Sequence, residues 1–163
     1  MDKGLSRLVE LLNARGASME EMVRLLEEER ASIVALQAER LQAAVEHKVQ
    51  VVARMEELDD DCRKVIADEA RARGLGEATL SPLLTGTPSP EKAELAGLQA
   101  RLSTLAREIR DMIADNRRLL ETSMVTVGRS LAFFQSRLTV AETYGHSGSM
   151  VERSSGGILR KEI

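Results

Sequence analysis

Residues that could do acid–base, nucleophilic or metal chemistry are few in this chain. The sequence holds two histidines, His47 and His146, and one cysteine, Cys62. A zinc protease needs His-Glu-x-x-His, a di-iron bundle needs Glu-x-x-His pairs, and a thiol nucleophile needs a partner histidine, and none of these patterns occurs. We therefore expect His47 on the surface of a helix and Cys62 as a small buried hydrophobic residue.

Two runs of acidic residues are the remaining candidates for a cation site. They lie at residues 27–29 and 56–61. A magnesium or calcium site needs oxygens that converge on one point, whereas consecutive residues point away from one another around a helix. We therefore expect both runs to be solvated helix faces. The sequence predicts no catalytic residue, no metal ligand and no cofactor, so an enzyme is the class with least support.

The composition favours helices and excludes several classes of partner. Of 163 residues, 22 are Leu and 19 are Ala, while only 2% are aromatic, and strands prefer the aromatic and β-branched residues. A net charge of −3 argues against a nucleic-acid partner. No apolar run approaches the ~20 residues that insert into a membrane. The single cysteine and the lack of an apolar leader near residue 1 indicate a cytoplasmic protein.

Breaker residues divide the chain. Proline is absent from the first 73 residues, the next segment is rich in Gly and Pro, and Ser89-Pro90-Glu91 is a strong helix start. The last twenty residues hold four Gly and four Ser, which is typical of a flexible tail. The sequence thus predicts an all-α protein, an antiparallel coiled-coil-style bundle of three long helices with room for a short fourth at 81–84. The expected ranges are helices 2–37, 41–73 and 90–141, a linker 74–89, a bundle domain 1–141 and a tail 142–163.

Residues 2–73 fit two arrangements. The apolar register changes between Leu36 and Leu41, without a Gly or Pro to mark a turn. Local signals therefore favour one helix of over ~100 Å, but such a helix would outrun its partner helix. We expect a turn near residues 38–40. A kink at Gly16 and Ser18, where a capping box follows the glycine, stays open.

The third long segment carries one apolar residue at every third or fourth position for 44 residues. Its only polar member is Asn116, which we expect to be buried and to fix the helix register. Val125 and Phe133 widen the stripe near its end, and that end would be a binding site if the earlier helices stop sooner. The stripe consists of Leu95, Leu98, Leu102, Leu105, Ile109, Ile113, Asn116, Leu120, Met124, Val127, Leu131, Phe134 and Leu138.

Five features in this order resemble the FlgN family of flagellar type III export chaperones. They are Leu-Leu-Glu-Glu-Glu-Arg at 25–30, Lys48 with the apolar run that follows it, the Gly/Pro break, Asn-Arg-Arg-Leu-Leu at 116–120, and Thr-Tyr-x-x-x-Gly at 143–148. Family members often carry a second Asn three residues before the Asn that begins Asn-x-x-Leu-Leu. In this chain that Asn is Asn116, and the position three residues before it is Ile113.

The resemblance implies a cytosolic chaperone for the hook-associated proteins FlgK and FlgL. It would hold their helix-prone C-terminal segment and deliver them to the export gate protein FlhA. We expect the substrate helix to bind Val127, Leu131, Phe134 and Leu138. Tyr144 is expected to dock at the gate, with a staple on its own bundle as the alternative. The chain is expected to be a monomer or weak dimer, and a coiled-coil scaffold that homo-oligomerises is the competing hypothesis.

Overall fold

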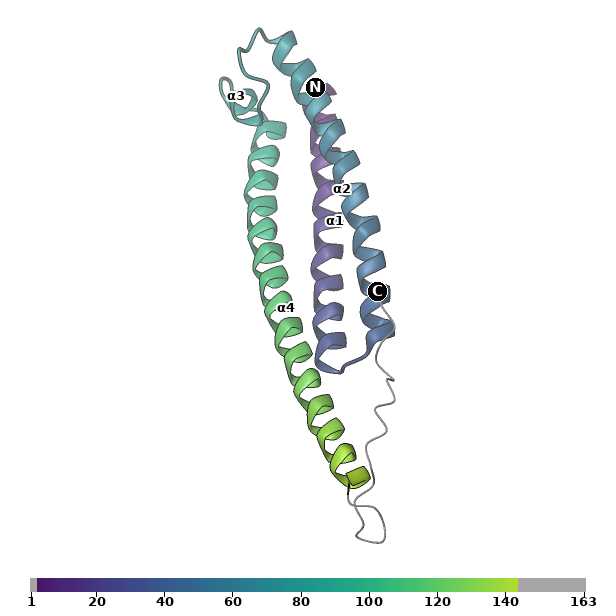
Figure 1. Cartoon of the computed structure of the whole chain (residues 1–163). Coiled ribbons are helices and arrows are strands. Elements are labelled where there is room, and N and C mark those ends of the chain that lie inside the picture. The colour runs from purple at the N-terminus through teal and green to yellow at the C-terminus, as the bar shows by residue number, and fades with distance from the viewer. Residues whose placement is uncertain (1–2, 144–163) are drawn as a thin grey trace. The chain divides into compact units, whose positions relative to one another are not determined.

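The computed structural model describes residues 3–143 and contains four helices there and no strand (Figure 1). They are α1 (Lys3–Val34), α2 (Ala38–Ala72), α3 (Leu80–Leu84) and α4 (Pro90–Thr143). The predicted all-α class, with three long helices and a short fourth, is confirmed. Residues 1–2 and nearly all of the predicted tail lie outside the described residues.

The chain divides into two compact units, Met1–Leu120 and Glu121–Ile163. The first unit contains α1, α2, α3 and the greater part of α4. In the described part of the second unit, residues 121–143 continue α4 as helix. The predicted domain boundary at residue 141 stays a prediction.

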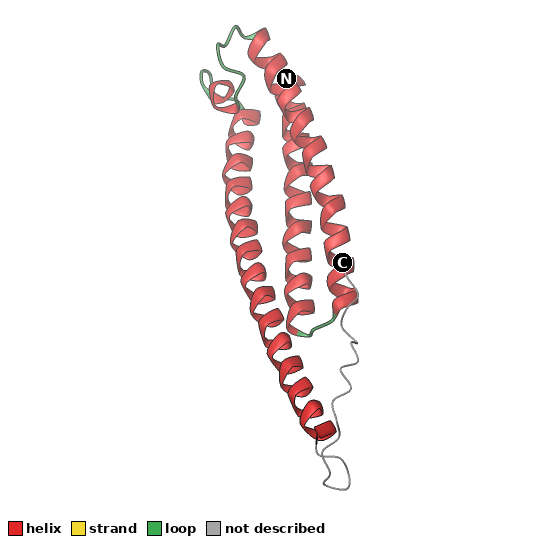
Figure 2. Cartoon of the chain, viewed as in Figure 1, coloured by secondary structure: helices red, strands yellow, loops and turns green. Residues whose placement is uncertain are grey.

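The chain turns between α1 and α2 at residues 35–37, just before the predicted 38–40 (Figure 2). The backbone N–H of Leu36 donates to the carbonyl of Ile33, and that of Gln37 donates to the carbonyl of Ser32. These two bonds form a Schellman helix end, which needs a left-handed residue where glycine is usual. Leu36 occupies that position with φ of 54°. The turn therefore lacks its usual sequence signal.

Gly16 does not break α1, which is continuous through this point. A Cβ added to Gly16 would lie 3.5 Å from Cδ2 of Leu102 in α4. Ser18, the expected cap residue, is buried within the helix. That distance is an ordinary van der Waals contact, so the packing of α4 does not require a glycine here, and α1 continues through residues 16–18 as one helix.

The segment from α2 to α4 follows its breaker residues. Gly74, with φ of 63°, closes α2 through the bonds Gly74 N–H to Arg71 O and Leu75 N–H to Ala70 O. Leu83 of α3 is fully buried and anchors the segment on the bundle. The side-chain oxygen of Ser89 accepts a hydrogen bond from the backbone N–H of Lys92 at 3.2 Å, which caps α4 as predicted.

Ion pairs and hydrogen bonds give the directions of the long helices in the first unit. Arg15 of α1 pairs with Asp59 of α2, and further along α1 Glu21 pairs with Arg54, so α1 and α2 are antiparallel. On α4, Arg101 pairs with Glu20 of α1 and Asn116 bonds to Leu26, so α4 runs parallel to α1. The chain therefore runs in one direction in α1, in the opposite direction in α2 and in the first direction again in α4, which is the antiparallel arrangement that the sequence predicts.

The core of the first unit is built mainly from leucines of α1 and α4 with smaller residues of α2. Its members have their apolar side chains almost entirely removed from water, which is the main force holding the helices together. The larger cluster contains Leu5, Leu8, Leu11, Leu12, Met19, Cys62, Leu95, Leu98 and Leu102, and the smaller one contains Met22, Leu25, Leu26 and Val51.

Candidate partner-binding surface

The apolar residues of α4 in the second unit are exposed. We call Met124, Val127, Leu131, Phe134 and Leu138 the apolar stripe. Each of these side chains is between 50% and 66% exposed. Steps of three and four residues keep all five on one side of the helix. An exposed row of this length is typical of a surface that binds a partner.

The same helix is buried where it packs in the first unit. Leu95, Leu98 and Leu102 are at most 8% exposed. Ile113, predicted as part of the buried row, is half exposed, and its neighbour Met112 packs against the core instead. Burial thus ends along α4 while the apolar pattern continues, which is the contrast that marks residues 124–138 as a candidate site.

Two aromatic residues in the second unit lie on different sides of the helix. The ring centroids of Phe133 and Phe134 are 5.8 Å apart, with the ring planes 72° to one another. The guanidinium carbon of Arg137 lies 5.2 Å from the Phe133 centroid, within range of a cation–π contact. Val125 and Phe133 are both more than half exposed and lie off the apolar stripe.

A buried polar cluster in the first unit contains Asn116. Its side-chain nitrogen donates to the carbonyl of Leu26 at 2.8 Å and to Oε2 of Glu29 at 2.9 Å. Glu29 also forms a close ion pair with Lys48 of α2. Asn116 is 4% exposed and Glu29 is 9% exposed. The cluster joins α1, α2 and α4 near the point where the burial of α4 ends.

Glu29 corrects one expectation from the sequence. Residues 27–29 were expected to form a solvated face, yet Glu29 is buried and paired. Glu29 follows Leu26 by three residues and precedes Ile33 by four, so it occupies a position of the buried row of α1. That spacing is the signal that could have identified it.

Comparison with protein families decides the identity. The sequence model of the FlgN protein family matches residues 1–152. The chain belongs to the FlgN family. Comparison with curated proteins finds no match, and comparison with solved structures finds none either. FlgN proteins are flagellar export chaperones, and that general function applies to this chain.

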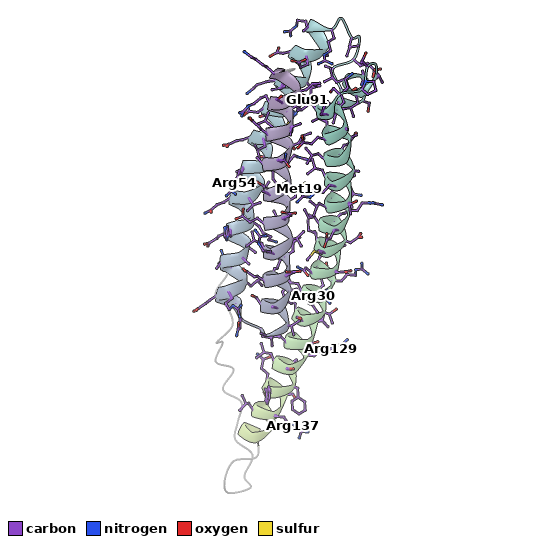
Figure 3. All side chains as sticks on the ribbon, turned by 180° about the vertical axis from the view of Figure 1, so that it is seen from behind. Met19, Arg30, Arg54, Glu91, Arg129 and Arg137 are labelled. Atoms are coloured by element: carbon purple, nitrogen blue, oxygen red, sulfur yellow. The ribbon has the colours of Figure 1, made fainter. Side chains whose placement is uncertain are left out.

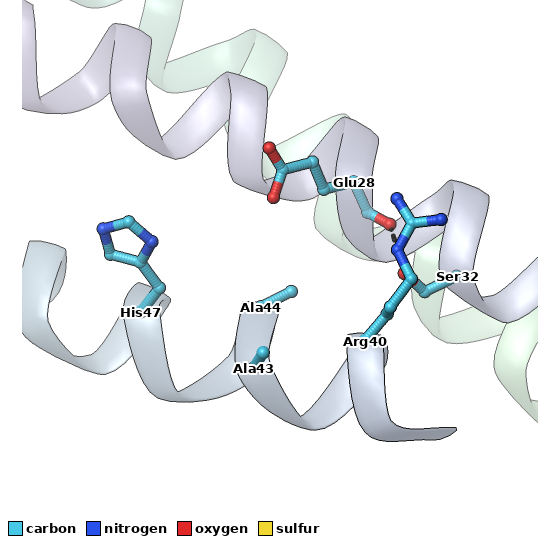
Figure 4. A pocket seen from close by; sticks show the side chains of 6 residues that line it. All are labelled: Glu28, Ser32, Arg40, Ala43, Ala44 and His47. Carbon is cyan, nitrogen blue, oxygen red and sulfur yellow. Dashed lines mark hydrogen bonds between the residues drawn. The ribbon is translucent and has the colours of Figure 1, made fainter. Parts of the chain in front are cut away.

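His47, one of the few residues of this FlgN chain that could act as an acid or base, lies in a surface ion pair. His47 Nε2 lies 3.3 Å from a carboxylate oxygen of Glu21, at the surface. Beside it is a shallow pocket of about 170 Å³ between α1 and α2. Arg40 and His47 extend from α2 opposite Glu28 of α1, with two alanines between them (Figure 4). The lining also contains Ser32, whose hydroxyl donates a hydrogen bond to the backbone carbonyl of Glu28 at 2.8 Å and not to His47.

Cys62 is buried in the larger core cluster of this FlgN chain. Burial raises the pKa of its thiol, and the negative charge of Asp59 raises the pKa further. The side chain is therefore a protonated, unreactive thiol at neutral pH, as a packing residue should be.

Neither a metal site nor a membrane span is found in the described part of this FlgN chain. Residues 3–143 contain no group of three or more His, Cys, Asp or Glu side chains placed to hold a metal ion. Within the same residues, every helix is too short or too polar to cross a bilayer. Tyr144, the predicted gate contact, lies outside the described residues.

Proposed function

We propose that the chain is a cytoplasmic chaperone that binds the C-terminal helical segment of the hook–filament junction proteins FlgK and FlgL and delivers them to FlhA. The observation that carries the proposal is the exposure of the apolar stripe, from Met124 to Leu138, on a helix whose earlier leucines are buried. Family membership supports the export function in general.

A substrate helix would fit the stripe by its spacing. Val127, Leu131, Phe134 and Leu138 repeat at steps of four, three and four, so a partner with apolar residues at the same intervals can place its side chains between them. Phe134 offers the largest apolar area of the four and is the expected centre of the interface. Covering this surface would also keep the substrate segment from premature assembly.

The competing hypothesis is a scaffold that self-associates through the same stripe. In self-associating coiled coils the positions beside the apolar row are often charged, and these charges set the register. Here Gly128, Ser130 and Gln135 occupy flanking positions. A glycine within a helix also lowers its stability by about 0.5–1 kcal/mol. These features favour an interface with a foreign helix over a stable homotypic coil.

Co-expression with FlgK and FlgL of the same organism, followed by size exclusion with mass determination, tests the proposal. The full chain is expected to form a defined complex with at least one junction protein and to be a monomer or weak dimer alone. A parallel variant that ends at Ala141 tests whether residues 142–163 strengthen the complex. Stable self-assembly without any complex would favour the scaffold.

Delivery to the export gate is tested separately. Tyr144→Ala is expected to weaken binding to the cytoplasmic part of FlhA, because an exposed aromatic residue is a typical anchor of an interface. The same variant should bind the junction protein as tightly as the original chain. Unchanged FlhA binding would assign Tyr144 to packing on its own bundle.

A further inference from the structure

The segment with the apolar stripe has a second exposed face. Val125, Arg129, Phe133 and Arg137 follow one another at steps of four residues, and we call these four the basic–aromatic face. Arg129 is two residues from both Val127 and Leu131, which places it about 160° around the helix from them. Arg129 therefore lies opposite the apolar stripe, while Phe133 and Arg137 lie closer to it, with the Phe133 ring centroid 5.8 Å from that of Phe134.

All charge on this face is positive. Arg129 and Arg137 are the only charged residues between Glu121 and Glu142. Both are exposed, and Figure 3 shows them along the last turns of α4. The net charge of the whole chain is −3, whereas residues 122–141 contain these two cations and no acidic residue.

The contact between Arg137 and Phe133 prepares the face for carboxylates. The guanidinium carbon lies over the ring at 5.2 Å from its centroid, and the N–H donors of a guanidinium lie along the edge of its plane. Such an edge accepts a carboxylate through two parallel hydrogen bonds. Val125 and Phe133, each more than half exposed, supply the apolar area that exposed charges alone lack.

We propose that the basic–aromatic face is a second docking surface and that its occupant is an acidic amphipathic helix of a partner protein. The occupant carries carboxylates about two helical turns apart, because the eight residues from Arg129 to Arg137 span ~12 Å. Apolar side chains between these carboxylates cover Val125 and Phe133. This surface is centred on the opposite side of α4 from the apolar stripe and meets it where the rings of Phe133 and Phe134 are in contact.

Two synthetic helical peptides of equal length and equal apolar pattern test the charge preference. One carries Glu, and the other carries Lys, at the two positions about two helical turns apart that would face Arg129 and Arg137. The full chain is expected to bind the Glu peptide and to bind the Lys peptide much more weakly. Affinity for the Glu peptide should fall as salt rises. Equal affinity for both peptides, or tighter binding of a single-stranded oligonucleotide than of the Glu peptide, would overturn the proposal.

Matched variants test the location. Arg129→Gln with Arg137→Gln should weaken binding of the Glu peptide about tenfold, through loss of two exposed charge pairs. The control variant, Arg107→Gln with Arg110→Gln, removes the same charge from exposed positions of the same helix. It should change the affinity for the Glu peptide by less than about twofold. Equal losses in both double variants would show a general effect of charge and contradict the docking surface.

A third variant separates this proposal from the proposed chaperone function. Leu131→Asn should no longer bind the junction-protein segment but should still bind the Glu peptide. The Arg129/Arg137 double variant should still bind the junction-protein segment but should bind the Glu peptide weakly. Loss of the Glu peptide in Leu131→Asn would place that peptide on the apolar stripe and refute a second surface. Failure of junction-protein binding alone leaves the peptide result standing.

Discussion

The side-chain amide of Asn116 in α4 donates a hydrogen bond of 2.9 Å to Oε2 of Glu29 in α1. Glu29 is in turn paired with Lys48 of α2, so one buried carboxylate links three helices. A buried charge is tolerated only where partners satisfy it. The cluster therefore fixes the position of α4 along α1, a role that hydrophobic contacts alone do not perform because leucines pack in several registers.

Asn116→Ala should lower the free energy of unfolding by about 1–3 kcal/mol, because Glu29 and the Leu26 carbonyl each lose a buried donor. Urea unfolding followed by circular dichroism measures the change. Asn13→Ala is the matched control, since Asn13 is exposed in α1 and its replacement should change stability by about 0.5 kcal/mol or less. Equal small effects in both variants would show that the cluster does not stabilise the bundle.

Leu36→Gly should raise the free energy of unfolding by about 1 kcal/mol. Leu36 holds a left-handed backbone conformation that costs about 1–2 kcal/mol for a residue with a side chain. Its side chain is 66% exposed, so little packing is lost. Val34→Gly, an equally exposed position at the end of α1, should instead destabilise by about 0.5–1 kcal/mol. A loss of stability in both variants would contradict the account of the turn.

Cys62 makes stability depend on alkaline pH. Thiols of the unfolded chain ionise near about pH 8.5, whereas burial raises the pKa of Cys62 in the folded chain. The unfolded state therefore loses its proton first, and stability falls as pH rises above about 8.5. Comparison of unfolding between pH 7 and 10 in the original chain and in Cys62→Ala isolates this contribution.

The same burial should slow reaction of the native thiol with a disulfide reagent to the rate at which the bundle opens. Mild urea should accelerate that reaction. A fast reaction at neutral pH without denaturant would mean that Cys62 is accessible, contrary to its place in the core.

Most of the fold could be predicted from local patterns. The start of α4 at Ser89 and Pro90, and the end of α2 at Gly74, carry standard cap residues, so the structure and the sequence agree there. The α1–α2 turn could be favoured only by size, because Leu36 takes the glycine position without being glycine. Backbone hydrogen bonds close this turn, and they leave no signal in the residue types.

The candidate site was predictable in pattern but incomplete in detail. The spacing of Val127, Leu131, Phe134 and Leu138 is visible in the sequence, yet the sequence cannot show that burial has ended before them. Glu29 was missed because three consecutive acids resemble a solvated face. Its burial depends on Asn116 and Lys48, which are far away in the sequence and close in space.

The central claim is that the apolar stripe binds the junction-protein segment, and one pair of variants tests it most directly. Val127→Glu and Val49→Glu make the same replacement at exposed helix positions of α4 and α2. Isothermal titration with the C-terminal segment of FlgK or FlgL should show at least about a tenfold loss of affinity for Val127→Glu, because a charge enters an apolar interface. Val49→Glu should bind within about twofold of the original chain. Unchanged binding by Val127→Glu, or an equal loss in both variants, would contradict the account.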